Sequence, residues 1–459
     1  MMRLSEVAAA CGGVLTGEDL SVERVGTDTR ADLNGALYVA LRGENFDGNA
    51  FLAEAKKAGA VAALIDRRGL GVVPADLPVI GVADTRLALG QLGGWWRQKF
   101  DIPVIGVTGS NGKTSVKEMC AVILGAWARA RGLDAGTAVL ATQGNLNNDL
   151  GLPQMLLRLR PSHVAAVFEM GMNHPGEIAY LARLSQPNVA VVNNAQRAHL
   201  EGMGEVMAVA REKGAIYSVL GDEGVAIINA DDAHADYWRE INVGRPMLSF
   251  GLAHNADVTA SYQMLAFGSR VQLKLRGEQR DFTLGVPGQH NVRNALAAAA
   301  ACLAAGVPLD LVAQGLSEYS GTKGRLQVKH SAAGAVVLDD TYNANPDSVR
   351  AGIDVLAATP GRKVLVLGDM GEIGDMSAQC HDEIGGYAKS QGIDRLLALG
   401  EHSAVAVRNF GSGAEHFESL ADLLAALRPM LAADVVVLVK GSRFMKMERV
   451  VAAITEDPK

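Results

Sequence analysis

The chain has 459 residues, of which 49% are hydrophobic and 20% charged, and its formal net charge is −7. This length exceeds one typical hydrophobic core and predicts two to four domains of a globular enzyme. The acidic balance argues against broad binding to nucleic acid or to anionic membranes, so any anionic substrate must be held by local groups.

The apolar segments and the cysteines predict a cytoplasmic protein without membrane insertion. Glu6 interrupts the N-terminal apolar stretch, which is too short for a signal-peptide core. The most apolar segment, Ala295 to Val307, is too short to span a bilayer and is typical of a buried helix. Four widely spaced cysteines form no Cys-x-x-Cys pair, so we expect reduced core residues. They are Cys11, Cys120, Cys302 and Cys380.

The first region, up to about Ala83, holds short strands and is expected to form a separate small α/β unit. After the next helix comes the strongest functional motif, the Gly-rich segment 104–115. Its first four residues read as a strand, and apolar residues after it repeat at helical spacing. A strand, a glycine loop and a helix N-terminus suit a triphosphate, because backbone N–H groups and the helix dipole favour anionic oxygens.

Within this motif, Lys113 can reach the terminal phosphates and Thr114 can place a hydroxyl on Mg²⁺. Val107 stands where a strict Walker A motif has glycine, and Gly109 is present instead. Nucleotide binding is the favoured interpretation, and an ordinary strand-to-helix turn is the alternative.

Downstream, short apolar strands alternate with amphipathic helices, which predicts a mainly parallel sheet covered by helices. Polar and apolar residues alternate from Asp257 to Val286, indicating an antiparallel excursion that a helix over 291–306 closes. The expected parallel strands are Val104–Val107, Val164–Phe168, Val189–Val192 and Val225–Ile228.

A third region begins around the Gly-rich segment 320–325 and is expected to be a small doubly wound, Rossmann-like domain. Its expected strands are Ala335–Leu338, Val364–Leu367, Leu396–Leu399 and Val435–Val439. The sequence thus predicts an α/β protein with three domains, over residues 1–83, 84–322 and 323–459.

Several polar residues follow the expected strands. Glu169 ends a hydrophobic strand downstream of the glycine loop and could lie beside a metal, as could Asp339 and Asp340 after another strand. Strands also commonly end in polar residues without such a role. His199 follows a third strand, and as an isolated residue a structural histidine is the favoured interpretation. Lys213 lies in a helical segment and by pattern alone is a solvated lysine.

Three further residues have both a structural and a functional interpretation. Asn291 and Asn294 open the alanine-rich helix, where they could cap it or bind the edge of an adenine. Arg325 lies at the junction before the third region. It could contact a transferring phosphate, or it could simply keep a linker polar.

The motifs together resemble the Mur ligases, and the resemblance covers the chain from about Val25 to Val450. The matching segments occur in the right order. They are T-G-S-N-G-K-T, T-Q-G-N-L-N-N, F-E-M-G, N-N-A-Q-R-A-H-L-E, G-Q-H-N-V-R-N-A, D-D-T-Y-N-A-N-P-D, L-G-D-M and V-K-G-S-R. Two of them, D-D-T-Y-N-A-N-P and K-G-S-R, resemble most closely the family member that joins D-alanyl-D-alanine to UDP-N-acetylmuramoyl-tripeptide.

The resemblance implies a role for each matching residue. The catalytic residues would be Lys113, Glu169, His199, Lys213 and Arg325. ATP would bind Gly109, Ser110, Asn111, Gly112, Lys113, Thr114, Ser115, Asn291, Asn294, Arg325 and Asp340. Mg²⁺ would bind Thr114, Glu169, His199 and, as a carbamate, Lys213. The two other substrates would contact Thr29, Arg30, Asn45, Phe46, Asp47, Thr142, Asn145, Asn147, Asn343, Asn345, Lys440, Ser442 and Arg443.

The implied reaction transfers the ATP γ-phosphoryl group to the carboxylate of the tripeptide, and the amine of D-alanyl-D-alanine then attacks the acyl phosphate. We also expect a monomer. Because three substrates must converge, its third domain should close on ATP binding, with segment 320–325 as the hinge. Alternatives are a sibling ligase with another amine substrate, a nucleotide-switched binding protein and a P-loop small-molecule kinase.

Overall fold

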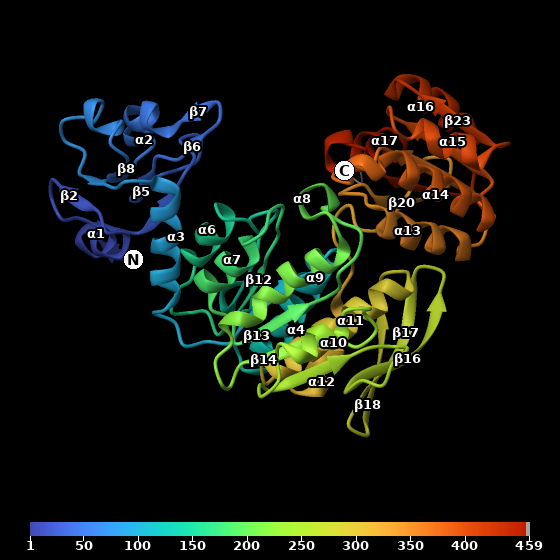
Figure 1. Ribbon diagram of the computed structural model, residues 1–459, viewed down its shortest axis with the longest axis horizontal. Helices are drawn as coiled ribbons and strands as arrows, with labels where there is room; N and C mark the ends of the chain where they lie inside the picture. The colour runs from blue at the N-terminus through green and yellow to red at the C-terminus, as the bar shows by residue number, and fades with distance from the viewer. Residues whose placement is uncertain (456–459) are drawn as a thin grey trace.

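The computed structural model describes residues 1–455, which form three α/β domains in chain order (Figure 1). The central domain lies between the other two, so the N-terminal and C-terminal domains stand at opposite ends of the molecule (Figure 1). Each domain is built on its own sheet, of five, nine and six strands respectively. This arrangement confirms the expected α/β fold class with three domains.

The N-terminal sheet has the strand order β2-β9-β8-β5-β4 and is parallel except where β2 pairs with β9. Strands β5 (Ala36–Val39) and β8 (Ala62–Ile65) are buried along their whole length, as central parallel strands usually are. The edge strands are β2 (Val14–Thr16) and β4 (Arg24–Gly26), and β9 (Val79–Gly81) lies between β2 and β8. Helices α1 (Leu4–Cys11) and α2 (Leu52–Lys57) complete this domain, and α3 (Thr85–Arg97) leads into the next.

The central sheet has the order β11-β12-β10-β13-β14-β15-β16-β17-β18, parallel as far as the β15–β16 pairing and antiparallel beyond it. The four predicted parallel strands and the antiparallel excursion are confirmed, whereas the short strands β11 and β15 were not predicted. The parallel strands are β11 (Val139–Ala141), β12 (Ala165–Glu169), β10 (Val104–Thr108), β13 (Val189–Val192), β14 (Val225–Asn229) and β15 (Met247–Phe250). The antiparallel strands are β16 (Val258–Leu265), β17 (Gly268–Leu275) and β18 (Glu278–Leu284).

Helices cover both faces of the central sheet because its strands are apolar on both sides. Val191 of β13 packs into the core beneath α4 (Lys113–Ala130), α11 (Gln289–Ala304) and α12 (Leu309–Glu318). The next residue, Val192, packs into the opposite core. That face is covered by α3, α6 (Gly151–Leu156), α7 (Glu177–Ser185), α9 (Val206–Gly214) and α10 (Ala235–Glu240).

The C-terminal sheet has the order β19-β20-β24-β21-β22-β23. The predicted strands appear as β20 (Val336–Asp340), β21 (Arg362–Gly368), β22 (Arg395–Leu399) and β24 (Val435–Lys440). Two edge strands, β19 (Gln327–His330) and β23 (Ala414–Phe417), were missed because edge strands need no continuous apolar run. The helices are α13 (Pro346–Ala358), α14 (Ser377–Ser390), α15 (Ala404–Phe410), α16 (Leu420–Leu427) and α17 (Glu448–Ile454).

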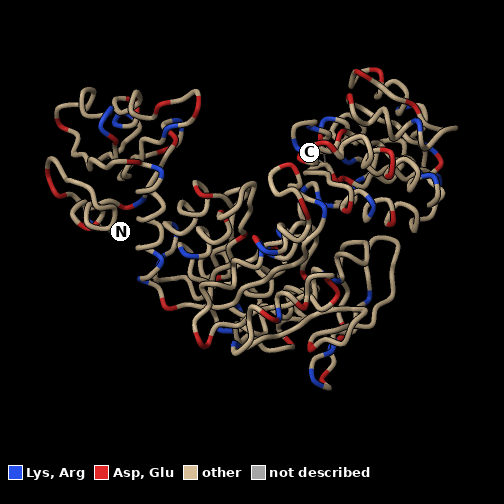
Figure 2. The backbone as a smooth tube through the Cα atoms, in the orientation of Figure 1, with Lys and Arg blue, Asp and Glu red and all other residues tan. Residues whose placement is uncertain are grey.

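Charged residues lie on all three domains (Figure 2), and the four cysteines lie in the core as the sequence predicts. Figure 2 shows acidic and basic residues interspersed over all three domains. No helix within residues 1–455 combines the length and the hydrophobicity needed to cross a bilayer. All four cysteines are buried free thiols.

Candidate active site

The glycine loop connects β10 to the N-terminus of α4, as the sequence predicts. Gly112 caps this helix in the left-handed region at φ 78°, which favours glycine. A Cβ atom there would lie 2.3 Å from Oδ1 of Asn294 and 2.5 Å from Nδ2 of Asn193. The close approach of these two amides therefore requires glycine at position 112 and joins the loop to the start of α11.

The Lys113 ammonium lies against the backbone of this loop. It donates to the carbonyl oxygens of Gly109, at 2.8 Å, and Ser110, at 3.3 Å. Burial lowers the pKa of Lys113, and the nearby charge of Glu169 opposes this shift. The loop thus holds a cation at a helix N-terminus, which is the arrangement that binds phosphate.

Glu169 lies at the end of β12 and is only 3% exposed. Its Oε1 accepts a hydrogen bond from Nδ2 of Asn147 at 2.7 Å, whereas its buried Oε2 has no hydrogen-bond partner. A buried carboxylate oxygen without a partner is costly and fits a position for a cation ligand. Within residues 1–455 no three His, Cys, Asp or Glu side chains are grouped closely enough to hold a metal alone. A divalent ion here would therefore need nucleotide oxygens and water in its shell, as Mg²⁺ sites usually have.

The side chains of Lys113, Glu169 and His199 line a common cavity of about 480 Å³, here called cavity one. The central domain and the C-terminal domain both contribute to its wall. Other predicted residues lining cavity one are Ser110, Asn111, Gly112, Asn145, Asn147, Arg325, Asn343 and Asn345. Polar groups dominate this wall, which suits anionic and peptide substrates.

A second cavity of about 370 Å³, cavity two, adjoins the first at Asn111, Gly112 and Arg325. Its wall includes Asn291 and Asn294 at the start of α11. The predicted residues Ser115, Asp340 and Lys440 complete the set found here. Cavity two thus brings together the asparagines expected for adenine and Asp340, which the family resemblance assigns to ATP, in a cavity that Glu169 does not line.

Arg325 lines both cavities, at the segment that connects α12 to β19. Its guanidinium lies over the ring of Tyr342, 4.2 Å from the ring centre. A cation stacked on an aromatic face is held in place without a carboxylate partner. The charge of Arg325 therefore stays available at the junction of the two cavities.

Several direct contacts join the C-terminal domain to the central domain beside the cavities. Asn345, the N-cap of α13, donates from Nδ2 to Oδ1 of Asn111 in the glycine loop at 2.8 Å. Arg197 forms ion pairs with Asp347 at 2.8 Å and with Glu383 at 2.7 Å. These contacts hold the two domains against each other at the nucleotide site.

The structure places other predicted residues outside cavity one. The Thr142 hydroxyl accepts a hydrogen bond from the backbone N–H of Glu169, so it stabilises the carboxyl end of β12. Ser442 bridges the backbone at Ala344 and Gly371. The expected substrate residue Lys440 pairs with Asp340 in cavity two rather than facing cavity one. Neither cavity wall contains Gly109, Thr114, Lys213 or Arg443, nor the N-terminal residues Thr29, Arg30, Asn45, Phe46 and Asp47.

Sequence reasoning missed several residues that the structure brings to the cavities. Glu372, Tyr342 and the Arg86–Asp149 pair all line cavity one. Glu372 could have been found, because it comes four residues after β21 and the carboxyl ends of parallel strands meet at one edge. The Arg197 ion pairs carry no local signal, since they join residues 150 and 186 positions apart.

The fold and the site together define a P-loop nucleotide enzyme in which another α/β domain covers the phosphate site. Three family models match the chain in order. They are "Mur ligase family, catalytic domain" over residues 21–94, "Mur ligase middle domain" over 107–302 and "Mur ligase, glutamate ligase domain" over 324–443.

Individual relatives match over nearly the full length. The chain is 43% identical to the UDP-N-acetylmuramoyl-tripeptide–D-alanyl-D-alanine ligase of Escherichia coli (strain K12), over 99% of this chain and 98% of the relative. A crystal structure of MurF from Acinetobacter baumannii aligns with a TM-score of 0.90 at 37% identity, covering 98% of this chain and 97% of that one. MurF ligase from Thermotoga maritima in complex with ADP aligns with a TM-score of 0.83 at 25% identity, covering 94% and 97%. The chain belongs to the Mur ligase family, and it is an ATP-dependent amide-bond ligase.

Proposed function

We propose that this enzyme joins D-alanyl-D-alanine to UDP-N-acetylmuramoyl-tripeptide, giving the UDP-linked pentapeptide, ADP and phosphate in peptidoglycan precursor synthesis. The observation that carries this proposal is the full-length similarity to ligases named for this reaction. The Escherichia coli ligase, for example, is 43% identical to this chain. The enzyme acts as a monomer in the cytoplasm. Its three domains cover residues 1–83, 84–322 and 323–459.

Each domain brings one substrate to the reaction. The N-terminal residues Thr29, Arg30, Asn45, Phe46 and Asp47 bind the uridine diphosphate end of one substrate. Thr142, Asn145 and Asn147 guide its peptide toward the glycine loop. Asn343, Asn345, Lys440, Ser442 and Arg443 belong to the side that receives the dipeptide, with the position of Lys440 beside Asp340 favouring an indirect role.

ATP binds across both cavities, with adenine at Asn291 and Asn294, ribose at Asp340 and the phosphates on residues 109–115. The carboxylate of the tripeptide attacks the γ-phosphorus, the bond to the β-phosphate oxygen breaks, and ADP leaves. The dipeptide amine then attacks the acyl carbon, loses a proton and expels inorganic phosphate. Lys113 and Arg325 stabilise the negative charge that moves between these oxygens, because both cations line the cavity where phosphate and carboxylate meet.

Magnesium fits this site on the chemistry of its side chains. The unpartnered Oε2 of Glu169 offers a hard anionic oxygen, and Thr114 and His199 supply a hydroxyl and a ring nitrogen. When bound, Mg²⁺ neutralises phosphate charge and polarises the transferring group. Lys213 contributes to the same site as a carbamate. Burial holds the pKa of Lys213 well below its ordinary value, and the charge of Lys113 acts in the same direction, which favours the neutral amine that reacts with CO₂.

One incubation tests the proposal against its alternatives. The enzyme is mixed with ATP, Mg²⁺, D-alanyl-D-alanine and a UDP-N-acetylmuramoyl-tripeptide that ends in either lysine or diaminopimelate, and the products are weighed. A mass gain of one dipeptide with at least one acceptor is expected. If the product gains mass only when another amino acid replaces D-alanyl-D-alanine, the protein is a sibling ligase. Phosphate release without a new amide indicates a nucleotide-switched protein, and a stable phosphorylated product indicates a kinase. Any of these three results overturns the proposal.

A further inference from the structure

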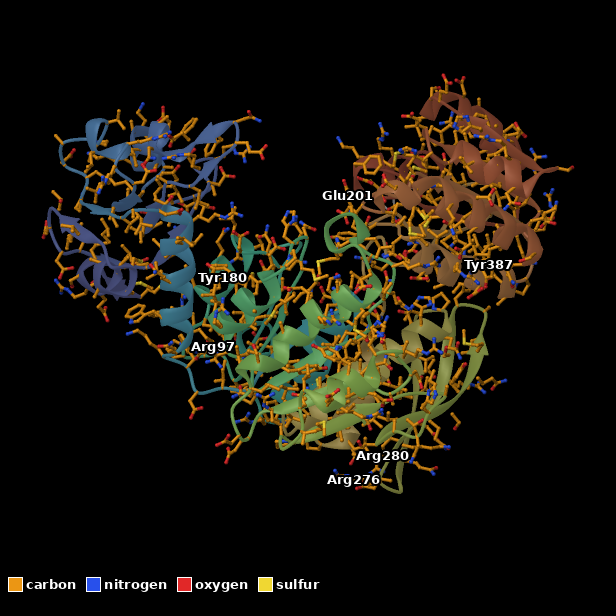
Figure 3. All side chains as sticks on the ribbon, in the orientation of Figure 1. Arg97, Tyr180, Glu201, Arg276, Arg280 and Tyr387 are labelled. Carbon is orange, nitrogen blue, oxygen red and sulfur yellow. The ribbon has the colours of Figure 1, made fainter. Side chains whose placement is uncertain are left out.

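Loops from two different domains meet at His199. The ring nitrogen Nδ1 of His199 lies 3.0 Å from Oε2 of Glu372, which follows β21 in the C-terminal domain. The backbone N–H of Glu201 also donates to the carbonyl of Glu372, at 3.4 Å. In Figure 1 the short helix α8 (Leu200–Met203) reaches from the central domain to the edge of the C-terminal domain, and Figure 3 marks Glu201 there.

The backbone of both partners is strained. His199 has φ 57° and Glu372 has φ 61°, in the left-handed region that side-chain-bearing residues rarely adopt. Such residues persist only where the surrounding structure holds them, and they cluster at functional sites. Two of them in direct contact across a domain boundary therefore indicate a geometry that the fold specifically maintains.

The carboxylate of Glu372 determines which nitrogen of His199 is free. Among the described residues of the C-terminal domain, Glu372 is the only acid that lines cavity one. A carboxylate oxygen can only accept a hydrogen bond, and Oε2 of Glu372 faces Nδ1 of His199 at 3.0 Å. Nδ1 is therefore the nitrogen that donates to this carboxylate, and Nε2 is the nitrogen left to face a metal ion.

We propose that Glu372 is a positioning residue for His199, and that closure of the C-terminal domain thereby completes the magnesium site of the central domain. The inference rests on the proposed function, which assigns His199 to Mg²⁺. Carboxylates that accept from a metal-binding histidine fix its tautomer and orientation and raise its basicity. Here that carboxylate comes from the domain that moves.

The coupling acts in both directions. If closure tightens metal binding, metal binding favours closure by the same free energy. The adjacent Arg197 holds the same segment against Asp347 and Glu383, so the histidine and its partner carboxylate are brought together whenever those ion pairs form. Closure and metal binding are therefore linked through residues 197–201.

The test uses Mn²⁺ as a spectroscopic probe for Mg²⁺, bound to the full-length enzyme with a non-hydrolysable ATP analogue. Electron spin echo modulation reports the coupling of a histidine nitrogen to Mn²⁺, and a titration gives the Mn²⁺ affinity. The variants are Glu372→Ala, Glu372→Gln, His199→Ala and the His199→Ala/Glu372→Ala double variant. Asp375→Ala is the matched control, because it removes an exposed acid three residues from Glu372.

Glu372→Ala is expected to weaken the Mn²⁺ affinity by about tenfold or more and to reduce the nitrogen coupling. Glu372→Gln keeps an acceptor without the charge and should lie between wild type and Glu372→Ala. Asp375→Ala should match wild type, and the double variant should bind no more weakly than His199→Ala alone. If His199→Ala weakens the binding but Glu372→Ala does not, or if the two losses add, the inference is wrong. If His199→Ala changes neither the Mn²⁺ affinity nor the nitrogen coupling, the assignment of His199 to the metal in the proposed function is wrong, and so is the inference that rests on it.

Discussion

Asp340 and Lys440 lie directly opposite each other at the carboxyl ends of β20 and β24, and Nζ of Lys440 donates to Oδ2 of Asp340 at 2.6 Å. Both residues are buried, and Lys440 also donates to the carbonyl of Asn343. Burial lowers the pKa of Lys440, while the charge of Asp340 opposes the shift. The pair thus fixes the carboxylate that we assign to ribose.

Lys440→Met should destabilise the protein, because it leaves the buried carboxylate of Asp340 unpaired. The expected loss in the free energy of unfolding is about 3 kcal/mol, measured by denaturant titration. The Asp340→Asn/Lys440→Met double variant should recover most of this stability, whereas its affinity for ATP should remain below that of wild type. A Lys440→Met protein as stable as wild type would show that the pair does not hold Asp340.

Arg325→Ala should slow turnover about 1,000-fold while weakening ATP binding less than tenfold, because its contact strengthens in the transition state. Steady-state kinetics and nucleotide titration measure the two effects separately. Arg325→Lys, which keeps the charge but not the planar fork, should recover part of the rate. Equal losses in turnover and in ATP affinity would make Arg325 a binding residue only.

The sequence predicted single elements well and contacts between domains poorly. Val189–Val192 was placed at its observed bounds because a buried parallel strand is a continuous apolar run. His199, in contrast, has no local feature that separates a ligand from a structural histidine, and only the family resemblance gave it a role. Its partner Glu372 lies 173 positions further along the chain, so their contact depends on domain packing rather than on any local pattern.

Lys113→Ala should lower turnover by about 100-fold to 1,000-fold, as the loss of one charge-stabilising donor usually does. The thermal midpoint should change by no more than about 2 °C, because the ammonium contacts only carbonyls of its own loop and its burial is unfavourable. Lys117→Met is the matched control on the same helix. Lys117 is buried, pairs with Glu118 and lines neither cavity, so its replacement should leave turnover near wild type. Full activity of Lys113→Ala would contradict the proposal that the glycine loop binds the ATP phosphates.

The ion pairs of Arg197 predict a specific pH dependence for the contact between the central and C-terminal domains. Hydrogen bonds from Arg197 and Arg350 lower the pKa of Glu383 from 4.5 to about 2. A lowered pKa stabilises the folded state fully above 4.5, and this contribution is lost as the pH falls from 4.5 toward 2. The thermal midpoint of wild type should exceed that of Glu383→Gln by about 3 °C from pH 8 to pH 5. The difference should shrink below pH 4.5, and a difference that grows on acidification would contradict the ion pairing.

Carbamylation of Lys213 can be tested directly with ¹³C-labelled bicarbonate. Lys213 is 1% exposed, and burial lowers its pKa well below the ordinary value, which favours the neutral amine that can add CO₂ with loss of one proton. A carbamate signal is expected in the ¹³C spectrum of wild type and should be absent from Lys213→Ala. Lys117→Met provides the control for a second buried lysine and should keep the signal. Because the carbamate would add a negative charge at Lys213, excess bicarbonate should strengthen Mn²⁺ binding in wild type but not in Lys213→Ala. If wild type binds Mn²⁺ equally well with and without bicarbonate, Lys213 has no role in the metal site and is a buried structural amine.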